Sequence, residues 1–154
     1  MPTPIKIPAA NTSSPFASWK AEHAAIRVAD FDAAVDWYTE KLDFRLTRSL
    51  PLHDLTYAFL SSAGDVSFSF EVVAGPGAEH RPSYEDLRAS LGFSGWHHIG
   101  FRVDSVDDTV DELKRRGVTI VSEPHDVPVM GLRLAFFADP WGNLFEVIQS
   151  LRQE

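Results

Sequence analysis

The stretch EHAAIRV, residues 22–28, is matched further along the chain by HHIGFRV, residues 97–103. In both stretches a His is followed four places later by Arg-Val. One offset relates His98 to His23 (98 − 23 = 75) and also Glu146 to Glu71 (146 − 71 = 75). A shared offset between residues this far apart is typical of an internal repeat of one supersecondary unit. The chain is therefore predicted to contain two copies of one module.

Each copy is predicted to run strand, helix and then three strands, because alternating apolar segments surround one segment of helical period. The first copy has expected strands at 24–29, 44–50, 55–62 and 66–73, with a helix at 31–42 after the N-cap Asp30. The second has strands at 97–103, 118–123, 132–138 and 143–150, with a helix between Ser105 and Gly117. The residues PLHD, 51–54, predict a strand break, and residues 83–91 predict a short helix capped by Ser83.

These segments divide the chain into an arm and one domain. Residues 1–19 are rich in Pro, Ser, Thr and Asn and predict an extended arm. Residues 20–154 predict a single α+β domain, with module one at 22–73, a linker at 74–96 and module two at 97–150. A chain of 154 residues is long enough for such a domain to bury a core of its own.

Composition excludes several function classes. The formal net charge of −8 disfavours nucleic acid and anionic membrane surfaces as partners. The absence of cysteine excludes disulfides, thiolate metal sites and cysteine nucleophiles. No apolar run has the length of a signal-peptide core or a membrane span, so we expect a cytoplasmic protein.

Strand parity predicts what the repeated His and Glu residues do. Side chains alternate along a strand, so His23 and His98 share a face with Arg27 and Arg102, opposite the apolar face. Two such polar faces can surround one hollow that holds two imidazoles and two carboxylates. This donor set suits one divalent ion among Ni, Zn, Co, Mn and Fe. The predicted metal ligands are His23, Glu71, His98 and Glu146.

The other His residues have weaker claims. His97 lies on the apolar face and has Glu22, not a His, as its repeat counterpart, so we interpret it as structural or as a residue that supports a ligand. His53, His80 and His125 fall in expected loops without a spacing pattern and are predicted to be surface residues.

Four stretches together resemble the vicinal oxygen chelate superfamily, which includes glyoxalase I (lactoylglutathione lyase), methylmalonyl-CoA epimerase, extradiol dioxygenases and bleomycin- or fosfomycin-resistance proteins. They are EHAAIRVADFDAAVDWYTEKLDF, FSFEVV, HHIGFRVDSVDDTVDEL and ADPWGNLFEVIQ. The resemblance covers residues 22–150 and implies paired βαβββ modules that form a curved mixed sheet around a central metal cavity, often in a homodimer. It also implies metal ligands at His23, Glu71, His98 and Glu146.

The reaction that follows from this resemblance is metal-dependent lyase or isomerase chemistry on a small vicinal-oxygen substrate, a hydroxycarbonyl or hemithioacetal, through an enediolate. A Glu that can leave the metal can move a proton, and the family's usual roles favour Glu146 over Glu71 as the base. Arg27 matches a glutathione-holding Arg of glyoxalase I, and with Arg102 it is a candidate for substrate binding.

Other members of the superfamily supply the alternatives. One is an Fe(II) extradiol-type dioxygenase that uses His23, His98 and Glu146, although Glu71 would occupy a position that oxygen needs. Another is an isomerase similar to methylmalonyl-CoA epimerase, since the linker is long and ends in WHHIGF, residues 96–101, while Gly75 departs from the Asn of bacterial glyoxalase I. A third is a non-catalytic protein that binds an antibiotic, although relatives of that kind lack the metal set. Whether the modules pair within one chain or across a dimer stays open.

Overall fold

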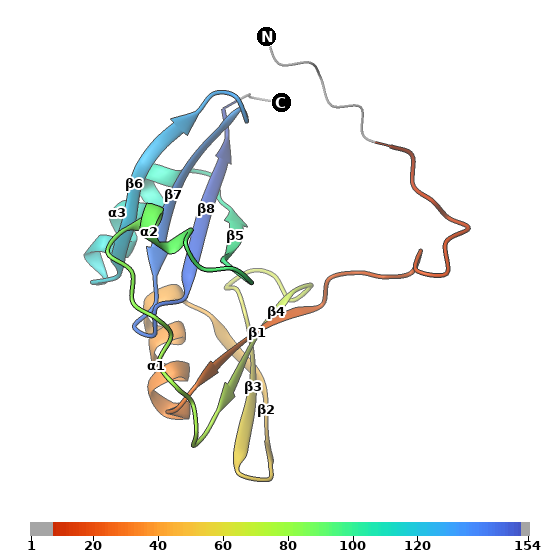
Figure 1. Ribbon diagram of the computed structural model, residues 1–154, viewed down its shortest axis with the longest axis vertical. Helices are drawn as coiled ribbons and strands as arrows, with labels where there is room; N and C mark the ends of the chain where they lie inside the picture. The colour runs from red at the N-terminus through yellow and green to blue at the C-terminus, as the bar shows by residue number, and fades with distance from the viewer. Residues whose placement is uncertain (1–7, 152–154) are drawn as a thin grey trace.

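The computed structural model describes residues 8–151 and contains two βαβββ modules in sequence (Figure 1). Module one consists of β1 (His23–Val28), α1 (Phe31–Leu42), β2 (Arg45–Leu52), β3 (Leu55–Ser61) and β4 (Ser69–Ala74). Module two consists of β5 (His98–Arg102), α3 (Val106–Arg115), β6 (Thr119–Val127), β7 (Leu132–Ala138) and β8 (Leu144–Ser150). The α+β class and the repeated strand–helix–three-strand order predicted from sequence are confirmed.

The two sheets have the same topology. Their strand orders are β1-β4-β3-β2 and β5-β8-β7-β6. In each sheet the first strand runs parallel to the last, and the other neighbours are antiparallel. The first strand of each module, which carries the candidate His, is therefore an edge strand of its sheet.

The helix ends follow from their capping residues. The Asp30 carboxylate accepts from the Ala33 amide at the start of α1, and the Ser105 hydroxyl accepts from the Asp108 amide at the start of α3. Gly117, with φ of 76°, ends α3 because glycine takes the left-handed conformation without a Cβ clash. Both helices lie where the sequence predicted them.

Of two local predictions, one was confirmed and one was wrong. The strand break predicted over residues 51–54 falls at His53, whose φ is 57°, and Asp54, because β2 continues through Pro51 to Leu52. Proline is tolerated there since β2 is an edge strand. The linker helix α2 covers only Leu87–Ser90, and Asp86, not Ser83, caps it.

The N-terminal arm was predicted over residues 1–19, of which 1–7 lie outside the described residues. Residues 8–22 contain turns but neither helix nor strand, and they lead away from both sheets (Figure 1). None of the helices described between residues 8 and 151 has the length and hydropathy needed to cross a membrane.

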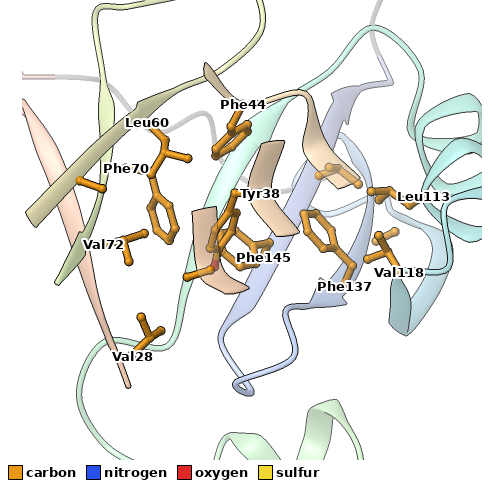
Figure 2. Packing of buried hydrophobic residues seen from close by; sticks show 14 of the residues in the cluster. Val28, Tyr38, Phe44, Leu60, Phe70, Val72, Leu113, Val118, Phe137 and Phe145 are labelled. Atoms are coloured by element: carbon orange, nitrogen blue, oxygen red, sulfur yellow. The ribbon is translucent and has the colours of Figure 1, made fainter. Parts of the chain in front are cut away.

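One hydrophobic core joins the two modules (Figure 2). Tyr38 of α1 is fully buried, and its ring lies 4.9 Å from that of Phe70 in module one and 6.1 Å from that of Phe145 in module two. Phe70 and Phe145 are themselves 5.6 Å apart, centroid to centroid. The Tyr38 hydroxyl also donates to the Asp139 carboxylate at 2.5 Å, so a polar bond crosses between the modules inside the core.

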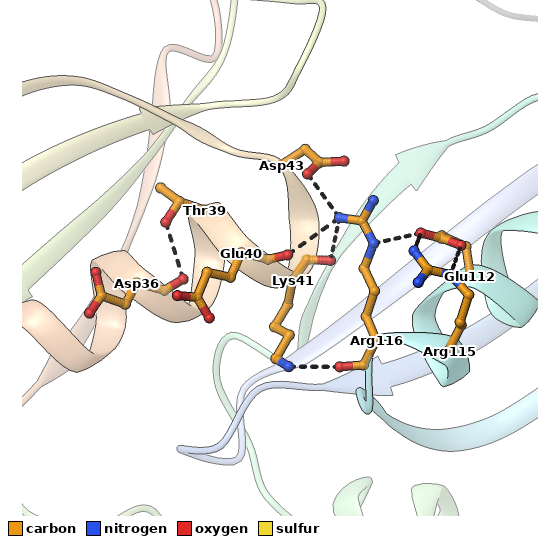
Figure 3. A network of polar contacts seen from close by, with 8 residues as sticks. All are labelled: Asp36, Thr39, Glu40, Lys41, Asp43, Glu112, Arg115 and Arg116. Carbon is orange, nitrogen blue, oxygen red and sulfur yellow. Dashed lines mark hydrogen bonds and ion pairs between the residues drawn. The ribbon is translucent and has the colours of Figure 1, made fainter.

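A second connection joins the C-terminal ends of α1 and α3 (Figure 3). Lys41 Nζ donates to the Arg116 carbonyl at 2.8 Å, and Arg116 Nη1 donates to the Lys41 carbonyl at 3.4 Å. These two residues are repeat counterparts, since 116 − 41 = 75. Arg116 also pairs with Asp43 at 2.9 Å and with Glu112 at 2.7 Å. We call this contact the helix-end clasp.

The shared core fixes which faces of the sheets remain open. Phe70, Val72 and Phe145 point into it, so the residues that alternate with them, Glu71 and Glu146, point to the opposite faces. The candidate ligands therefore lie on the faces of the two sheets that do not pack in the core.

Candidate metal site

Module one brings its predicted pair together. His23 begins β1, and Glu71 lies on the neighbouring strand β4 opposite Ala25, so the two side chains share a face diagonally. His23 Nε2 is 3.6 Å from Glu71 Oε2. The edge of the imidazole contacts the ring of Phe59 on β3, with centroids 6.0 Å apart.

Module two repeats this arrangement. His98 begins β5, Glu146 lies opposite Gly100 on β8, and His98 Nε2 is 3.4 Å from Glu146 Oε2. Phe136 of β7 contacts the His98 ring at 5.1 Å, in the place that Phe59 has in module one. A Cβ at Gly100 would lie only 3.2 Å from Glu146 Oε2, so the glycine leaves room for this carboxylate.

One chain does not bring the two pairs together. Over residues 8–151, the structure contains no group of three or more His, Cys, Asp or Glu side chains placed to hold a metal ion. The four predicted ligands thus form two His–Glu pairs, one on each sheet. Each pair contains half of the predicted donor set.

The environments of the imidazoles differ. The pKa of His23 is raised, chiefly by its hydrogen bond to the Glu22 carboxylate and further by the negative charges of Glu22 and Glu71. The pKa of His97, next to His98, is lowered, first by burial and then by the nearby charges of His98 and Arg81.

The two predicted substrate-binding arginines are placed differently. The Arg27 guanidinium donates to the carbonyls of Val73 at 3.2 Å, Gly75 at 2.9 Å and Pro76 at 2.6 Å, and also to the Val28 carbonyl. It therefore ties β1 to the start of the linker. Arg102 is exposed, and within the described residues its side chain has no hydrogen bond or ion pair. It borders a cavity of about 440 Å³ between the modules, together with Asp65 and Phe68.

The remaining His residues lie apart from both pairs, except His97. His53 and His80 are exposed, and His125 is held by the Glu123 carbonyl at 2.8 Å. His97 contacts His98 directly, with 2.8 Å between the two Nδ1 atoms, and its Nε2 lies 2.9 Å from the Ser90 hydroxyl.

Sequence reasoning missed several neighbours of the pairs: Glu22, Phe59, Ser90, Gly100 and Phe136. The sequence identified Glu22 only as the repeat counterpart of His97 (97 − 22 = 75), and its contact with His23 could have been expected because it precedes His23 as His97 precedes His98. Ser90 lies in the linker, which has no counterpart in the repeat, so no spacing pattern pointed to it.

The fold consists of two βαβββ modules. Each module carries one His–Glu pair on the face of its sheet that lies outside the core, and each pair has half of the predicted donor set. The chain belongs to the Glyoxalase/Bleomycin resistance protein/Dioxygenase superfamily, whose family model matches residues 20–147. The predicted superfamily is thereby confirmed.

The relatives carry the names of different activities. A probable chloroplastic lactoylglutathione lyase from Arabidopsis thaliana is 32% identical over 130 residues, which are 82% of this chain and 35% of that protein. A 2-epi-5-epi-valiolone epimerase from an Actinomyces species is 31% identical over 121 residues, 76% of this chain and 60% of that protein. Glyoxalase I from Zea mays superimposes with a TM-score of 0.68 at 28% identity, over 88% of this chain and 45% of that one. The chain spans less than two thirds of the length of each of these relatives.

Proposed function

We propose that the protein is a metal-dependent lyase or isomerase of the glyoxalase type, and that two copies of the chain complete each site. The observation that carries this proposal is the pair of matching His–Glu contacts, 3.6 Å and 3.4 Å long, on the edge strands of two separate sheets. The relatives with lyase and epimerase names support the reaction class.

The residues fit a divalent ion. Ligand atoms about 2.1 Å from a metal lie roughly 3.0 Å apart at a right angle and roughly 3.4 Å apart at a tetrahedral angle. The two Nε2–Oε2 separations of 3.6 and 3.4 Å are close to the wider of these values. Each pair could therefore supply two neighbouring ligands to one ion with small side-chain adjustments.

A second copy would supply the missing half. β1 and β5 each have one edge without a strand partner in the described part of the chain, and such edges favour pairing with another chain. If β1 of one copy lies beside β5 of the other, the two sheets become one continuous sheet. His23 and Glu71 then lie beside the partner's His98 and the partner's Glu146 on the same face of that sheet. A two-fold dimer would then contain two equivalent sites.

A divalent ion held by His23, Glu71, His98 and Glu146 would supply Lewis-acid polarisation of a substrate carbonyl, which makes the neighbouring C–H more acidic. Glu146, with only 16% of its side chain exposed, removes the proton from the neighbouring carbon and returns it to the adjacent one. Glu71, with 12% exposed, approaches from the other module. Arg27 and Arg102, at the far ends of the same strand faces, hold anionic parts of the substrate.

Epimerisation is the second candidate, since an epimerase is among the relatives. It begins with the same proton removal next to a carbonyl and differs in the face to which the proton returns. The two-module arrangement favours this possibility, because Glu71 and Glu146 are repeat counterparts that would approach a shared substrate from opposite sides. Extradiol cleavage would appear as ring cleavage of a catechol by the iron-loaded form, and a non-catalytic antibiotic-binding protein would bind no divalent ion.

The first test is metal content followed by an isomerisation assay. Purified protein should contain one divalent ion per chain, and His98→Ala should lose it while the surface variant His125→Ala keeps it. The loaded protein is then assayed with methylglyoxal and a thiol for hemithioacetal isomerisation. Ring cleavage of a catechol by the iron-loaded form, without isomerisation, would instead support the dioxygenase alternative. A protein that binds no divalent ion contradicts the proposal.

The second test asks where the two halves meet. His23→Ala and His98→Ala variants are mixed, exchanged through mild denaturant and refolded. If each site is shared between two copies, a mixed dimer has one site with all four ligands and one site that lacks both His residues. With random pairing, about a quarter of all sites would then bind metal again. Sites formed within one chain would give no restoration, since every chain lacks a ligand. The double variant His23→Ala/His98→Ala, mixed with itself, is the matched control.

A further inference from the structure

In both modules the residue immediately before the candidate His ligand contacts one nitrogen of that imidazole. It is the nitrogen that faces away from the glutamate of the same module. Glu22 Oε2 contacts His23 Nδ1, and His97 Nδ1 lies 2.8 Å from His98 Nδ1. In each ring Nε2 is the nitrogen near the glutamate. Positions 22 and 97 are thus equivalent in the fold although their side chains differ in chemistry.

The hydrogen bonds of module two fix the direction in which protons are shared. The Ser90 hydroxyl donates to the Leu87 carbonyl at 2.5 Å, so the Ser90 oxygen is left to accept. His97 Nε2, 2.9 Å away, must then carry the hydrogen that this oxygen accepts. A neutral imidazole has one N–H, so His97 Nδ1 is an acceptor and His98 Nδ1 carries the hydrogen between them.

This sequence of bonds leaves His98 Nε2 without a hydrogen and with its lone pair on the side of Glu146. That is the tautomer a metal ligand needs. The opposite direction would require Ser90 to give up the Leu87 carbonyl, and Ser90 is only 3% exposed, so little water can replace that partner.

We infer that Ser90 and His97 are positioning residues that hold His98 in its metal-binding tautomer, and that Glu22 does the same for His23. The inference rests on the proposed metal site, and it gives the linker a role in that site through Ser90. Ligating imidazoles are commonly oriented through their other nitrogen, and loss of such partners typically lowers metal affinity about 10- to 100-fold.

The two modules should respond unequally. Ser90 is buried, so water cannot easily take over its hydrogen bond to His97. The Glu22 side chain is 75% exposed, so water can replace the carboxylate after Glu22→Ala. We expect His97→Phe to weaken metal binding about 10- to 100-fold, and Glu22→Ala to weaken it less.

The experiment has two independent readouts. Affinity for Co²⁺ or Ni²⁺ is measured by competition with a chromophoric chelator for wild type, His97→Phe, Ser90→Ala, Glu22→Ala and the control His125→Ala. His97→Asn is the conservative variant, because its amide oxygen can accept from His98 Nδ1 as the ring nitrogen does, and it should recover part of the affinity. In parallel, long-range ¹H–¹⁵N correlation spectra of metal-free, ¹⁵N-histidine-labelled protein report the His98 tautomer.

Wild type should show His98 with its hydrogen on Nδ1, and His97→Phe and Ser90→Ala should show a mixture of tautomers. Unchanged His98 spectra in both variants would overturn the inference, and so would metal affinities equal to that of His125→Ala. Because the spectra need no metal, they test the effect of Ser90 and His97 on the His98 tautomer even if the wild-type protein binds no ion. Absence of metal binding by wild type would contradict the proposed function alone.

Discussion

At the scale of single residues, Glu146 is the base in the proposed reaction. It lies 3.4 Å from His98 Nε2 on the open face of β8, with Gly100 opposite it. Replacing it by Gln keeps the shape but removes the base, so kcat should fall about 10²- to 10⁴-fold. Turnover and metal content are measured together with excess ion present. The exposed Glu79→Gln is the control, and full turnover by metal-loaded Glu146→Gln would move the base role to Glu71.

Variants of Arg27 and Arg102 should have different effects on KM and on thermal stability. Arg102 has no partner in the described residues, so Arg102→Ala should raise KM more than it lowers kcat, as expected for lost uniform binding. Arg27 has carbonyl partners in β4 and the linker, so Arg27→Ala should also lower the thermal midpoint. Arg88→Ala, at an exposed position of α2, serves as the control in both measurements. An Arg102→Ala enzyme with unchanged KM would remove Arg102 from the substrate site.

At the scale of secondary-structure elements, the helix-end clasp predicts a pH dependence. Hydrogen bonds from Arg115 and Arg116 lower the pKa of Glu112 from 4.5 to about 2. A carboxylate with a depressed pKa in the folded state stabilises the protein above its unfolded pKa, and this contribution is lost as pH falls from about 4.5 through about 2. Urea midpoints of wild type and Glu112→Gln should differ at pH 7 and converge as the pH falls through that range. A difference that stays constant with pH would contradict this assignment.

The contact between α1 and the turn before β8 predicts a change in the free energy of unfolding. Tyr38→Phe keeps the buried ring but removes the donor to Asp139, and a hydrogen bond to a charged group contributes about 1.5–3 kcal/mol. Asp139 keeps its contacts with the Trp141 and Asn143 amides, so the variant should still fold. Urea unfolding is compared with Tyr57→Phe, whose hydroxyl has no partner in the described residues. Equal losses in the free energy of unfolding for the two variants would show that the hydrogen bond from Tyr38 to Asp139 does not stabilise the protein.

At the scale of the whole molecule, the separation of the two His–Glu pairs predicts an assembly. A chain of 17.2 kDa that contains two half-sites should be found by light scattering at about twice that mass. The dimer should persist at micromolar concentration and should be stabilised by added divalent ion, because ligands that bind only the assembled form favour it. A monomer that retains its full metal content would place all four ligands within one chain instead.

Much of this architecture could be predicted from residue spacing alone. Alternation along β1 and β5 places His23 and His98 opposite their apolar neighbours whatever the rest of the chain does. The offset of 75 residues relates His23 to His98 and Glu71 to Glu146. Because a repeated module repeats its internal geometry, the His and Glu of one module are expected to lie as those of the other do. Both pairs are neighbours in the structure. Their role as metal ligands stays a prediction.

Only the tertiary structure decided how the two halves relate. The sequence could not show that both helical faces enter one core around Tyr38, Phe70 and Phe145, which leaves the pairs on separate sheets. It also could not show that Ser90 reaches His97 or that Arg27 binds linker carbonyls. These contacts join elements that follow no common period, so they depend on how the modules and linker pack, whereas periodicity determines only what happens within a strand, a helix or a repeated module.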